Sequence, residues 1–282
     1  MIMDNVIVAN KGNIYLPHVF TQESETACKV VQMLLEVPEP VRLAPVMEQI
    51  RGLLGIQLSP RQYEGVEMVF QHNLSIITGG PGTGKSTILK AVIEAYQRLY
   101  PKSVIKLGAL TGKASRRMAE TTGMDSAQTL HSLLGLHGED AGWQKKQELE
   151  ADLLIVDECS MMDMWLAYQL FSRLKPGTKV LLVGDADQLE RVGAGSVFRE
   201  LIECGLVPVT VLDQIFRQAK DSLIAYNAKF VREGNCDLYY GRDFAFIQAE
   251  SQEEVAELIR EVYRNELGQT SMELSFAPCP RK

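Results

Sequence analysis

A glycine-rich loop, set between a short apolar run and a helical pattern, limits the possible folds of this chain more than any other feature. The apolar run covers residues 74–77, the loop Gly79-Gly80-Pro81-Gly82-Thr83-Gly84-Lys85-Ser86-Thr87 contains G-x-x-x-x-G-K-S, and the helical pattern lies near 86–99. A strand before the loop and a helix after it separate this motif from a chance glycine-rich turn. Glycines let the backbone N–H groups point inward, and the helix N-terminus adds positive potential. The loop therefore predicts a cradle for phosphate groups.

Each residue of the loop has an expected role in binding a nucleotide. Lys85 would reach the β- and γ-phosphates, and the Ser86 hydroxyl would hold Mg²⁺. The residues expected to contact the nucleotide are Gly80, Pro81, Gly82, Thr83, Gly84, Lys85, Ser86 and Thr87. A nucleoside triphosphate with Mg²⁺ is the expected ligand.

The alternation of apolar runs and helical patterns predicts the fold class. The strand candidates cover 74–77, 104–107, 153–156, 180–183 and 209–212, and helical patterns lie near 86–99, 113–121, 162–173 and 195–203. Continuous apolar strands that alternate with helices are typical of a parallel sheet covered by helices on both faces. The predicted fold is an α/β P-loop NTPase domain.

Three regions are expected along the chain: 1–57, 58–212 and 213–282. The first predicts a hairpin from 6–8 and 14–16 and helices over 23–35 and 44–54. The second holds the nucleotide-binding domain. The third predicts helices near 221–233 and 252–264 and strands at 244–247 and 274–276, which is the beginning of a further domain and not a complete one.

Composition narrows the classes of function. Lysine plus arginine is 29 and aspartate plus glutamate is 36, so the net charge is 29 − 36 = −7. A chain of this charge does not coat nucleic acid non-specifically, and any polyanion must be held by a local cationic patch. The five scattered cysteines, none in a CxxC pair, argue against disulfides and zinc and favour a reducing compartment. The apolar runs are too short for a membrane span, so a cytoplasmic protein is expected.

Two adjacent carboxylates end the apolar run at 153–156. Asp157 can bind the water shell of Mg²⁺ beside the phosphate loop. Glu158 leaves the strand at a different angle and can orient a water molecule onto the γ-phosphate. A phosphotransferase has no need of such a glutamate, so the pair favours hydrolysis over phosphate transfer.

Two further residues are candidates for contacts with the γ-phosphate. Gln188 follows the run at 180–183, and its amide can both donate to a phosphate oxygen and accept from the attacking water. Arg217 follows the run at 209–212, and a guanidinium there would stabilise charge in the transition state. A surface position remains the alternative for both side chains.

Seven segments follow one another in the order of a known set of motifs. They are 58–62 (LSPRQ), 79–87 (GGPGTGKST), 109–117 (ALTGKASRR), 127–135 (AQTLHSLLG), 157–163 (DECSMMD), 184–189 (GDADQL) with 192–195 (VGAG), and 216–218 (FRQ). In this order they resemble the Q-motif, motifs I and Ia, the next DNA-contacting segment, motifs II and III and the start of motif IV of superfamily 1 helicases. The chain is most similar to the RecD-like group of bacterial DNA helicases.

The resemblance implies a fold, an activity and contacts. It implies a RecA-like domain that hydrolyses ATP with Mg²⁺ and drives 5′→3′ movement along single-stranded DNA, in DNA recombination or repair. Gln62 would read the adenine edge, and Arg217 would contact the γ-phosphate. Thr111, Lys113 and Arg116 would bind DNA phosphates, and His131 would pack against a sugar or base. For the basic residues a solvated helix face is the alternative, and for His131 a packing role.

Two departures from the family pattern predict that the chain is a fragment of a longer helicase. Motif Ia lacks the proline that often precedes its threonine, and nothing after residue 218 resembles motifs V and VI. The expectation is a fragment that binds ATP but cannot unwind DNA alone. A P-loop phosphotransferase and a non-catalytic, nucleotide-gated adaptor are the alternative functions.

Overall fold

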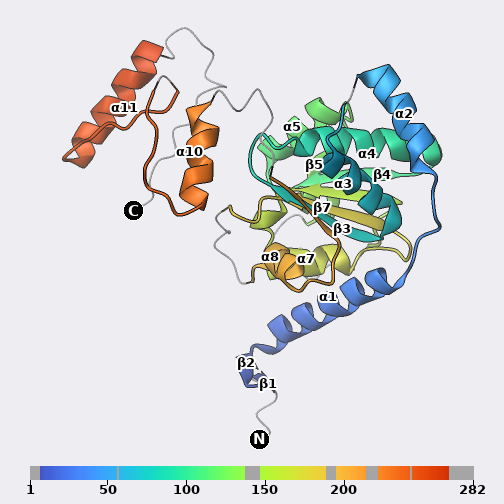
Figure 1. Ribbon diagram of the computed structural model, residues 1–282. Coiled ribbons are helices and arrows are strands. Elements are labelled where there is room, and N and C mark those ends of the chain that lie inside the picture. Colours follow the sequence, from blue (N-terminus) through green and yellow to red (C-terminus); the bar gives the residue numbers. More distant parts are fainter. Residues whose placement is uncertain are drawn as a thin grey trace, which may run out of the picture. The chain divides into compact units, whose positions relative to one another are not determined.

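The computed structural model describes residues 7–55, 57–136, 147–188, 195–213, 222–241 and 243–266 of the 282-residue chain (Figure 1). The chain divides into two units, Met1–Lys220 and Asp221–Lys282. The first unit contains the phosphate loop and the six-stranded sheet. Its N-terminal helices therefore group with the nucleotide-binding region.

A six-stranded sheet lies at the centre of the first unit. Its strands are β3 (Leu74–Gly79), β4 (Ile105–Ala109), β5 (Gln128–Thr129), β6 (Leu153–Asp157), β7 (Lys179–Gly184) and β8 (Val209–Leu212). Their spatial order is β5-β4-β6-β7-β3-β8, and every pair is parallel. The carboxyl ends of all six strands therefore meet at one edge, which is where open parallel sheets bind ligands. The expected parallel α/β fold is confirmed.

Side-chain alternation along the buried strands builds a core on each face of the sheet. Leu154 and Val156 contribute to one core, whereas Leu153 and Ile155 contribute to the other. These strands are buried on both faces, which is why they consist of continuous apolar runs.

Two groups of helices supply the outer halves of these cores. One group comprises α1 (Pro17–Leu35), α7 (Met164–Phe171) and α8 (Val197–Glu203), and the other comprises α2 (Leu43–Leu54), α3 (Pro60–Gln71), α4 (Lys85–Leu99) and α5 (Gly112–Thr122). Figure 1 shows the two groups on opposite faces of the sheet. The smaller elements of this unit are α6 (Leu130–Leu133) and the 3₁₀ turn η1 (Cys159–Met161).

The N-terminal region packs on the nucleotide-binding domain. A short antiparallel hairpin, β1 (Val8–Asn10) with β2 (Asn13–Tyr15), precedes α1. The helix begins at Pro17 and not near residue 23, because proline fits the first helical position without losing a hydrogen bond. Helix α1 packs against α7, and α2 packs against α4.

The second unit contains α10 (Leu223–Arg232) and α11 (Gln252–Glu266), close to the two helices expected from the sequence. The Asn227 amide group donates to the carbonyl oxygen of Tyr239 at 2.6 Å and accepts from its N–H at 2.9 Å. The expected strand over 244–247 is wrong. Within the residues that the structure describes, an isolated bridge joins Gly241 to Phe244 and residues 245–247 pair with no strand. The strand expected at 274–276 lies outside the described residues.

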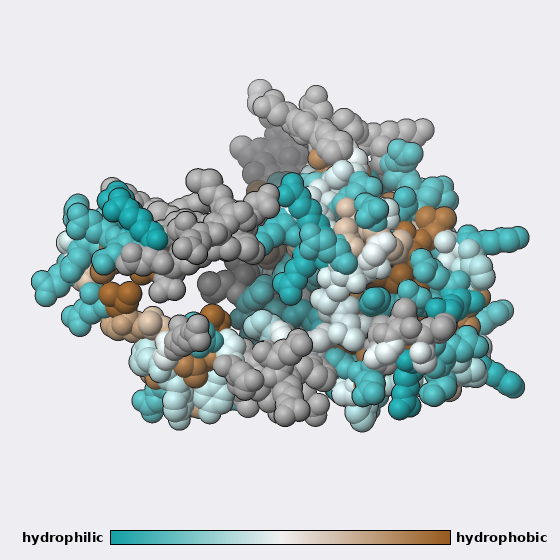
Figure 2. Space-filling view, turned by 90° about the horizontal axis from the view of Figure 1, so that it is seen from above, coloured by the Kyte–Doolittle hydropathy of each residue, from teal (hydrophilic) through white to brown (hydrophobic). Residues whose placement is uncertain are grey.

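The face seen in Figure 2 is mainly hydrophilic, with hydrophobic residues in small patches between polar ones. Such scattered apolar residues are normal on a protein surface. Among the described helices, none combines the length and the apolarity needed to cross a membrane.

Candidate nucleotide-binding site

A cavity of about 560 Å³ opens at the carboxyl edge of the sheet, where β3 and β6 end. Most of its lining comes from the phosphate loop, helix α5 and the two carboxylates at the end of β6, and single residues from α3, α4 and the loop after β7 complete it. The lining residues are Gln57, Gln62, Gly80–Thr87, Leu89, Ala114, Arg117, Met118, Thr121, Thr122, Asp157, Glu158 and Gln188. All loop residues expected from the sequence to contact a nucleotide are among them.

Close packing fixes the shape of the phosphate loop. A Cβ atom on Gly79 would lie 2.6 Å from the carbonyl oxygen of Leu212, so only glycine fits where the loop leaves β3. Gly82 and Gly84 have φ values of 76° and 84°, which glycine adopts without strain. Inside the loop, the buried Thr83 hydroxyl donates to the Gly80 carbonyl at 2.8 Å. The loop is therefore held in a wrapped form by its own contacts.

Gln62 anchors this loop to helix α3. Ser59 caps the helix, and the Gln62 side-chain oxygen accepts from the Ser59 N–H at 2.9 Å, which completes a capping box. The side-chain nitrogen of Gln62 donates to the carbonyl of Thr83 at 3.3 Å. Gln62 is 2% exposed, so both ends of its amide are committed inside the protein. Gln62 lines the cavity and its hydrogen bonds support the loop, and its expected contact with the adenine edge stays a prediction.

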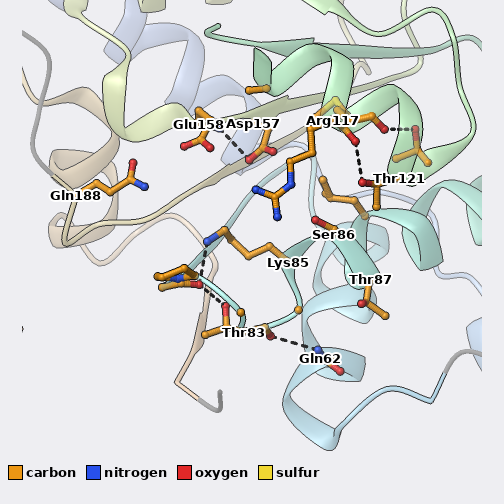
Figure 3. Close-up of a pocket in the computed structure, with 18 of the residues that line it drawn as sticks. Gln62, Thr83, Lys85, Ser86, Thr87, Arg117, Thr121, Asp157, Glu158 and Gln188 are labelled. Atoms are coloured by element: carbon orange, nitrogen blue, oxygen red, sulfur yellow. Dashed lines mark hydrogen bonds between the residues drawn. The ribbon is translucent and has the colours of Figure 1, made fainter. Parts of the chain in front are cut away.

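Lys85 points its ammonium group back along the loop (Figure 3). The Nζ atom donates to the carbonyl of Gly79 and, at 3.1 Å, to that of Gly80. Burial lowers the pKa of Lys85, and the nearby carboxylates of Asp185, Asp157 and Glu158 oppose that effect. The lysine is thus a partly desolvated cation that faces acidic groups, a setting in which it would favour phosphate oxygens.

Asp157 and Glu158 lie in the wall of the cavity across from Lys85 (Figure 3). Asp157 is the last residue of β6, and its carboxylate accepts from the Glu158 N–H at 2.8 Å. Glu158 has φ 60° and ψ 33°, a left-handed conformation that turns the chain sharply into η1. This sharp turn brings two consecutive carboxylates to the same cavity, which strand alternation alone would not do.

Burial changes the proton affinity of both carboxylates. It raises the pKa of Asp157, whereas the Glu158 N–H, Lys85 and Arg117 lower it. Burial and the neighbouring Asp157 raise the pKa of Glu158, and Lys85 and Arg117 oppose them. A carboxylate with a raised pKa is a better proton acceptor, as a general base requires.

The residues expected to hold Mg²⁺ fit a hard cation. The Ser86 hydroxyl and the Asp157 carboxylate line the same cavity, and both are oxygen donors of the kind that Mg²⁺ prefers. Asp157 is a half-buried acid whose pKa is raised by desolvation, so a cation beside it would relieve that penalty. When bound, the ion would polarise phosphate oxygens and neutralise their charge.

Gln188 reaches the cavity from the loop after β7. Its side-chain oxygen accepts from the Ser160 hydroxyl at 3.1 Å, which links this loop to the 3₁₀ turn after Glu158. The loop is also tied to β3, since the Ala186 N–H donates to the Thr78 hydroxyl at 3.0 Å. The loop after β7 is therefore bonded both to the turn after β6 and to strand β3 beside the cavity.

Helix α5 adds residues that sequence reasoning did not assign to this site. Arg117, Met118, Thr121 and Thr122 all line the cavity. Figure 3 shows the Arg117 guanidinium pointing into it, toward Asp157 and Ser86. The charge pattern of Lys113, Arg116 and Arg117 is that of a solvated helix face, and it gives no sign of this role.

The residues expected to bind DNA lie outside the cavity lining. Thr111 is the N-cap of α5, and its hydroxyl accepts from the Ala114 N–H at 3.2 Å. Lys113 and Arg116 are exposed on the same helix. His131 lies on α6, with its ring centroid 6.3 Å from that of Trp165. Arg217 lies outside the described residues, so its expected contact with the γ-phosphate stays a prediction.

The strand order and the loop geometry define a RecA-like P-loop nucleotide-binding domain. A family model described as an AAA domain matches residues 62–194. The chain is 38% identical over 224 residues to the "ATP-dependent RecD2 DNA helicase" of Deinococcus radiodurans, which covers 79% of this chain and 30% of that protein. It is 36% identical over 165 residues to the "RecBCD enzyme subunit RecD" of Haemophilus influenzae, which covers 50% of this chain and 26% of that protein. The chain belongs to the RecD-like group of superfamily 1 helicases.

Among the solved structures, the Pif1 helicase from Candida albicans is similar. It shares 28% identity, covers 64% of this chain and 45% of its own, and superposes with a TM-score of 0.49. The chain spans about a third or less of the length of the two curated relatives named above. The activities of those longer proteins are therefore assigned to this chain only as a proposal.

Proposed function

We propose that this chain binds Mg·ATP in the cavity at the carboxyl edge of the sheet and that Glu158 directs its hydrolysis. The observation that carries the proposal is the position of Glu158, which lines the cavity beside Asp157 and across from Lys85. In the proposed step, water attacks the γ-phosphorus, the bond from that phosphorus to the β–γ bridging oxygen breaks, and Glu158 takes the proton. The products are ADP and inorganic phosphate.

Each remaining residue of the site has a proposed role in that step. Backbone N–H groups of the loop and Lys85 hold the phosphates, Ser86 and Asp157 hold Mg²⁺, and Gln188 contacts the γ-phosphate and the water. Gln62 fixes the loop by its bond to Thr83. We also carry the expectation that Arg217 stabilises charge on the γ-phosphate.

We further propose that ATP turnover in the intact protein drives 5′→3′ movement along single-stranded DNA. The support is that the two relatives named above are a DNA helicase and a subunit of the RecBCD enzyme, and both come from bacteria, which also favours the bacterial cytoplasm. Thr111, Lys113, Arg116 and His131 would make the DNA contacts. Three of these residues lie at or near the start of α5, a helix that also lines the ATP cavity.

The test measures ATP binding and turnover by this chain with and without oligo-dT, for the unchanged chain and for Lys85→Ala and Glu158→Gln. We expect Lys85→Ala to lose ATP affinity and Glu158→Gln to bind ATP without turning it over. We expect oligo-dT to raise ATP affinity or turnover.

The alternatives give different results in the same assay. A phosphotransferase tolerates Glu158→Gln, and an adaptor binds ATP tightly but never turns it over. Failure of the unchanged chain to bind Mg·ATP would refute the nucleotide assignment. If neither affinity nor turnover responds to oligo-dT, the DNA assignment is wrong.

A further inference from the structure

Arg117 is a cation in the cavity that the proposed step has not used. It lies on α5, and its side chain is exposed, although it lines the same cavity as Ser86, Asp157 and Glu158. Its charge acts on three groups of the site, since it lowers the pKa values of Lys85, Asp157 and Glu158. The guanidinium is therefore close enough to take part in the chemistry of the cavity.

The position of Arg117 differs from that of Lys85. Lys85 is folded onto the carbonyls of the loop, at Gly79 and Gly80, on the side where β3 ends. Arg117 enters from the other wall and points toward Asp157 and Ser86, where the metal would sit (Figure 3). If Mg²⁺ offset the charge of Asp157, the anions left for the guanidinium in this cavity would be Glu158 and the terminal phosphate of bound ATP, and the phosphate would carry the larger charge.

We infer that Arg117 binds the γ-phosphate of ATP and that it does so from the helix that carries the expected DNA contacts. This inference rests on the proposed ATP site and assigns to that site a residue that lies at the end of the segment resembling motif Ia, to which no contact with ATP was assigned from the sequence. A guanidinium suits the role because its planar set of donors can make paired bonds to phosphate oxygens.

Helix α5 connects this contact with the DNA side of the domain. Thr111 caps the helix and Lys113 and Arg116 follow within its first turns, so Arg117 lies about 9 Å along the axis from the cap. The helix is anchored through buried Met118 and Ser115. Binding of the γ-phosphate by Arg117 therefore acts on α5, the same helix that carries the expected DNA contacts. Loss of that phosphate frees Arg117, and this couples the nucleotide state to the affinity for DNA.

The experiment measures the affinity of the 282-residue chain for a slowly hydrolysed ATP analogue and for ADP, each with and without oligo-dT. In Arg117→Ala we expect the affinity for the analogue to fall by about tenfold or more, the scale of one lost charged hydrogen bond. We expect the affinity for ADP to stay within about twofold, since ADP lacks the phosphate that Arg117 contacts. The effect of oligo-dT on binding of the analogue should be lost.

Arg98→Ala is the matched control, because Arg98 is an exposed arginine on α4 that pairs with Glu94 and lies outside the cavity. It should bind all ligands as the unchanged chain does. Arg117→Lys keeps the charge without the planar donors and should fall between the two. Equal affinities for the analogue in Arg117→Ala and the unchanged chain would overturn the inference, as would an equal loss for the analogue and ADP. If the unchanged chain binds neither ligand, the proposed ATP site itself fails.

Discussion

Replacement of Gln62 by alanine separates two ways in which this residue can serve the ATP site. In the family resemblance it reads the adenine edge. In the structure its amide joins the Ser59 N–H, at 2.9 Å, to the Thr83 carbonyl, at 3.3 Å. The substitution removes both bonds at once and leaves the bond from the Gln62 N–H to the Ser59 hydroxyl, which belongs to the backbone.

The structure gives the size of the expected effect. Each of the two lost hydrogen bonds contributes about 1 kcal/mol to stability, so unfolding should become easier by about 2 kcal/mol. For a unit of this size, that corresponds to a fall in Tm of about 4–8 °C. The freed Thr83 carbonyl also loosens the loop, and loss of one phosphate contact would weaken ATP binding by about tenfold.

Thermal unfolding and equilibrium binding of ATP and GTP test this reasoning together. If Gln62 acts through the loop, Gln62→Ala lowers Tm and weakens ATP and GTP by the same factor. Gln71→Ala, an exposed glutamine at the end of the same helix, is the control and should change neither quantity. An unchanged Tm with a loss confined to ATP would refute the anchoring role and favour adenine recognition.

Three further predictions concern Gly79 in the phosphate loop, Glu158 as the proposed general base and the buried Lys179. Gly79→Ala should destabilise the domain by about 1–3 kcal/mol and abolish ATP binding, because its Cβ would lie 2.6 Å from the Leu212 carbonyl; unfolding in urea and ATP titration check this. ATP turnover should be lost on acidification at a pH above that expected for an ordinary glutamate, because burial raises the pKa of Glu158 and a protonated base cannot accept the water's proton; a pH–rate profile measures it. Burial lowers the pKa of Lys179 from 10.5 to about 8, so the folded state binds fewer protons than the unfolded state between these values, and stability rises with pH. Relative to Lys179→Met, the unchanged chain should therefore gain about 2 kcal/mol of unfolding free energy between pH 8 and pH 10, and equal pH dependence of the two proteins would contradict this.

The sheet could be predicted from the sequence because its strands are buried on both faces. Strands β6 and β7 contain continuous apolar runs at 153–156 and 180–183, and the runs in β3 and β4 are interrupted only by Ser75 and Lys106, so the strands lie near the expected limits. The sequence prediction was wrong for elements whose ends or strand pairing depend on tertiary contacts. Helix α1 extends back to Pro17 and packs against α7, and the apolar run at 244–247 pairs with no strand in the described part of the chain.

The candidate site divides in the same way. Gln62, the loop, Asp157, Glu158 and Gln188 line one cavity, as their places before, in and after predicted strands indicated. Arg117 could not be assigned from its own neighbourhood, because Lys113, Arg116 and Arg117 together have the pattern of a solvated face. What decides its role is the packing of α5 against α4 and β6, a contact between segments about 20 to 40 residues apart.

At Glu158 the local backbone preference and the chemistry of the site call for different residues. A left-handed conformation costs a residue other than glycine or asparagine about 1–2 kcal/mol, so local preference would put glycine at this turn. Glycine would relieve the strain and remove the carboxylate. The structure holds the glutamate there with two bonds, from its own N–H to Asp157 at 2.8 Å and from the Met161 N–H to its carbonyl at 3.1 Å. The strain is therefore balanced locally, and what it provides is a second carboxylate in the cavity next to the first.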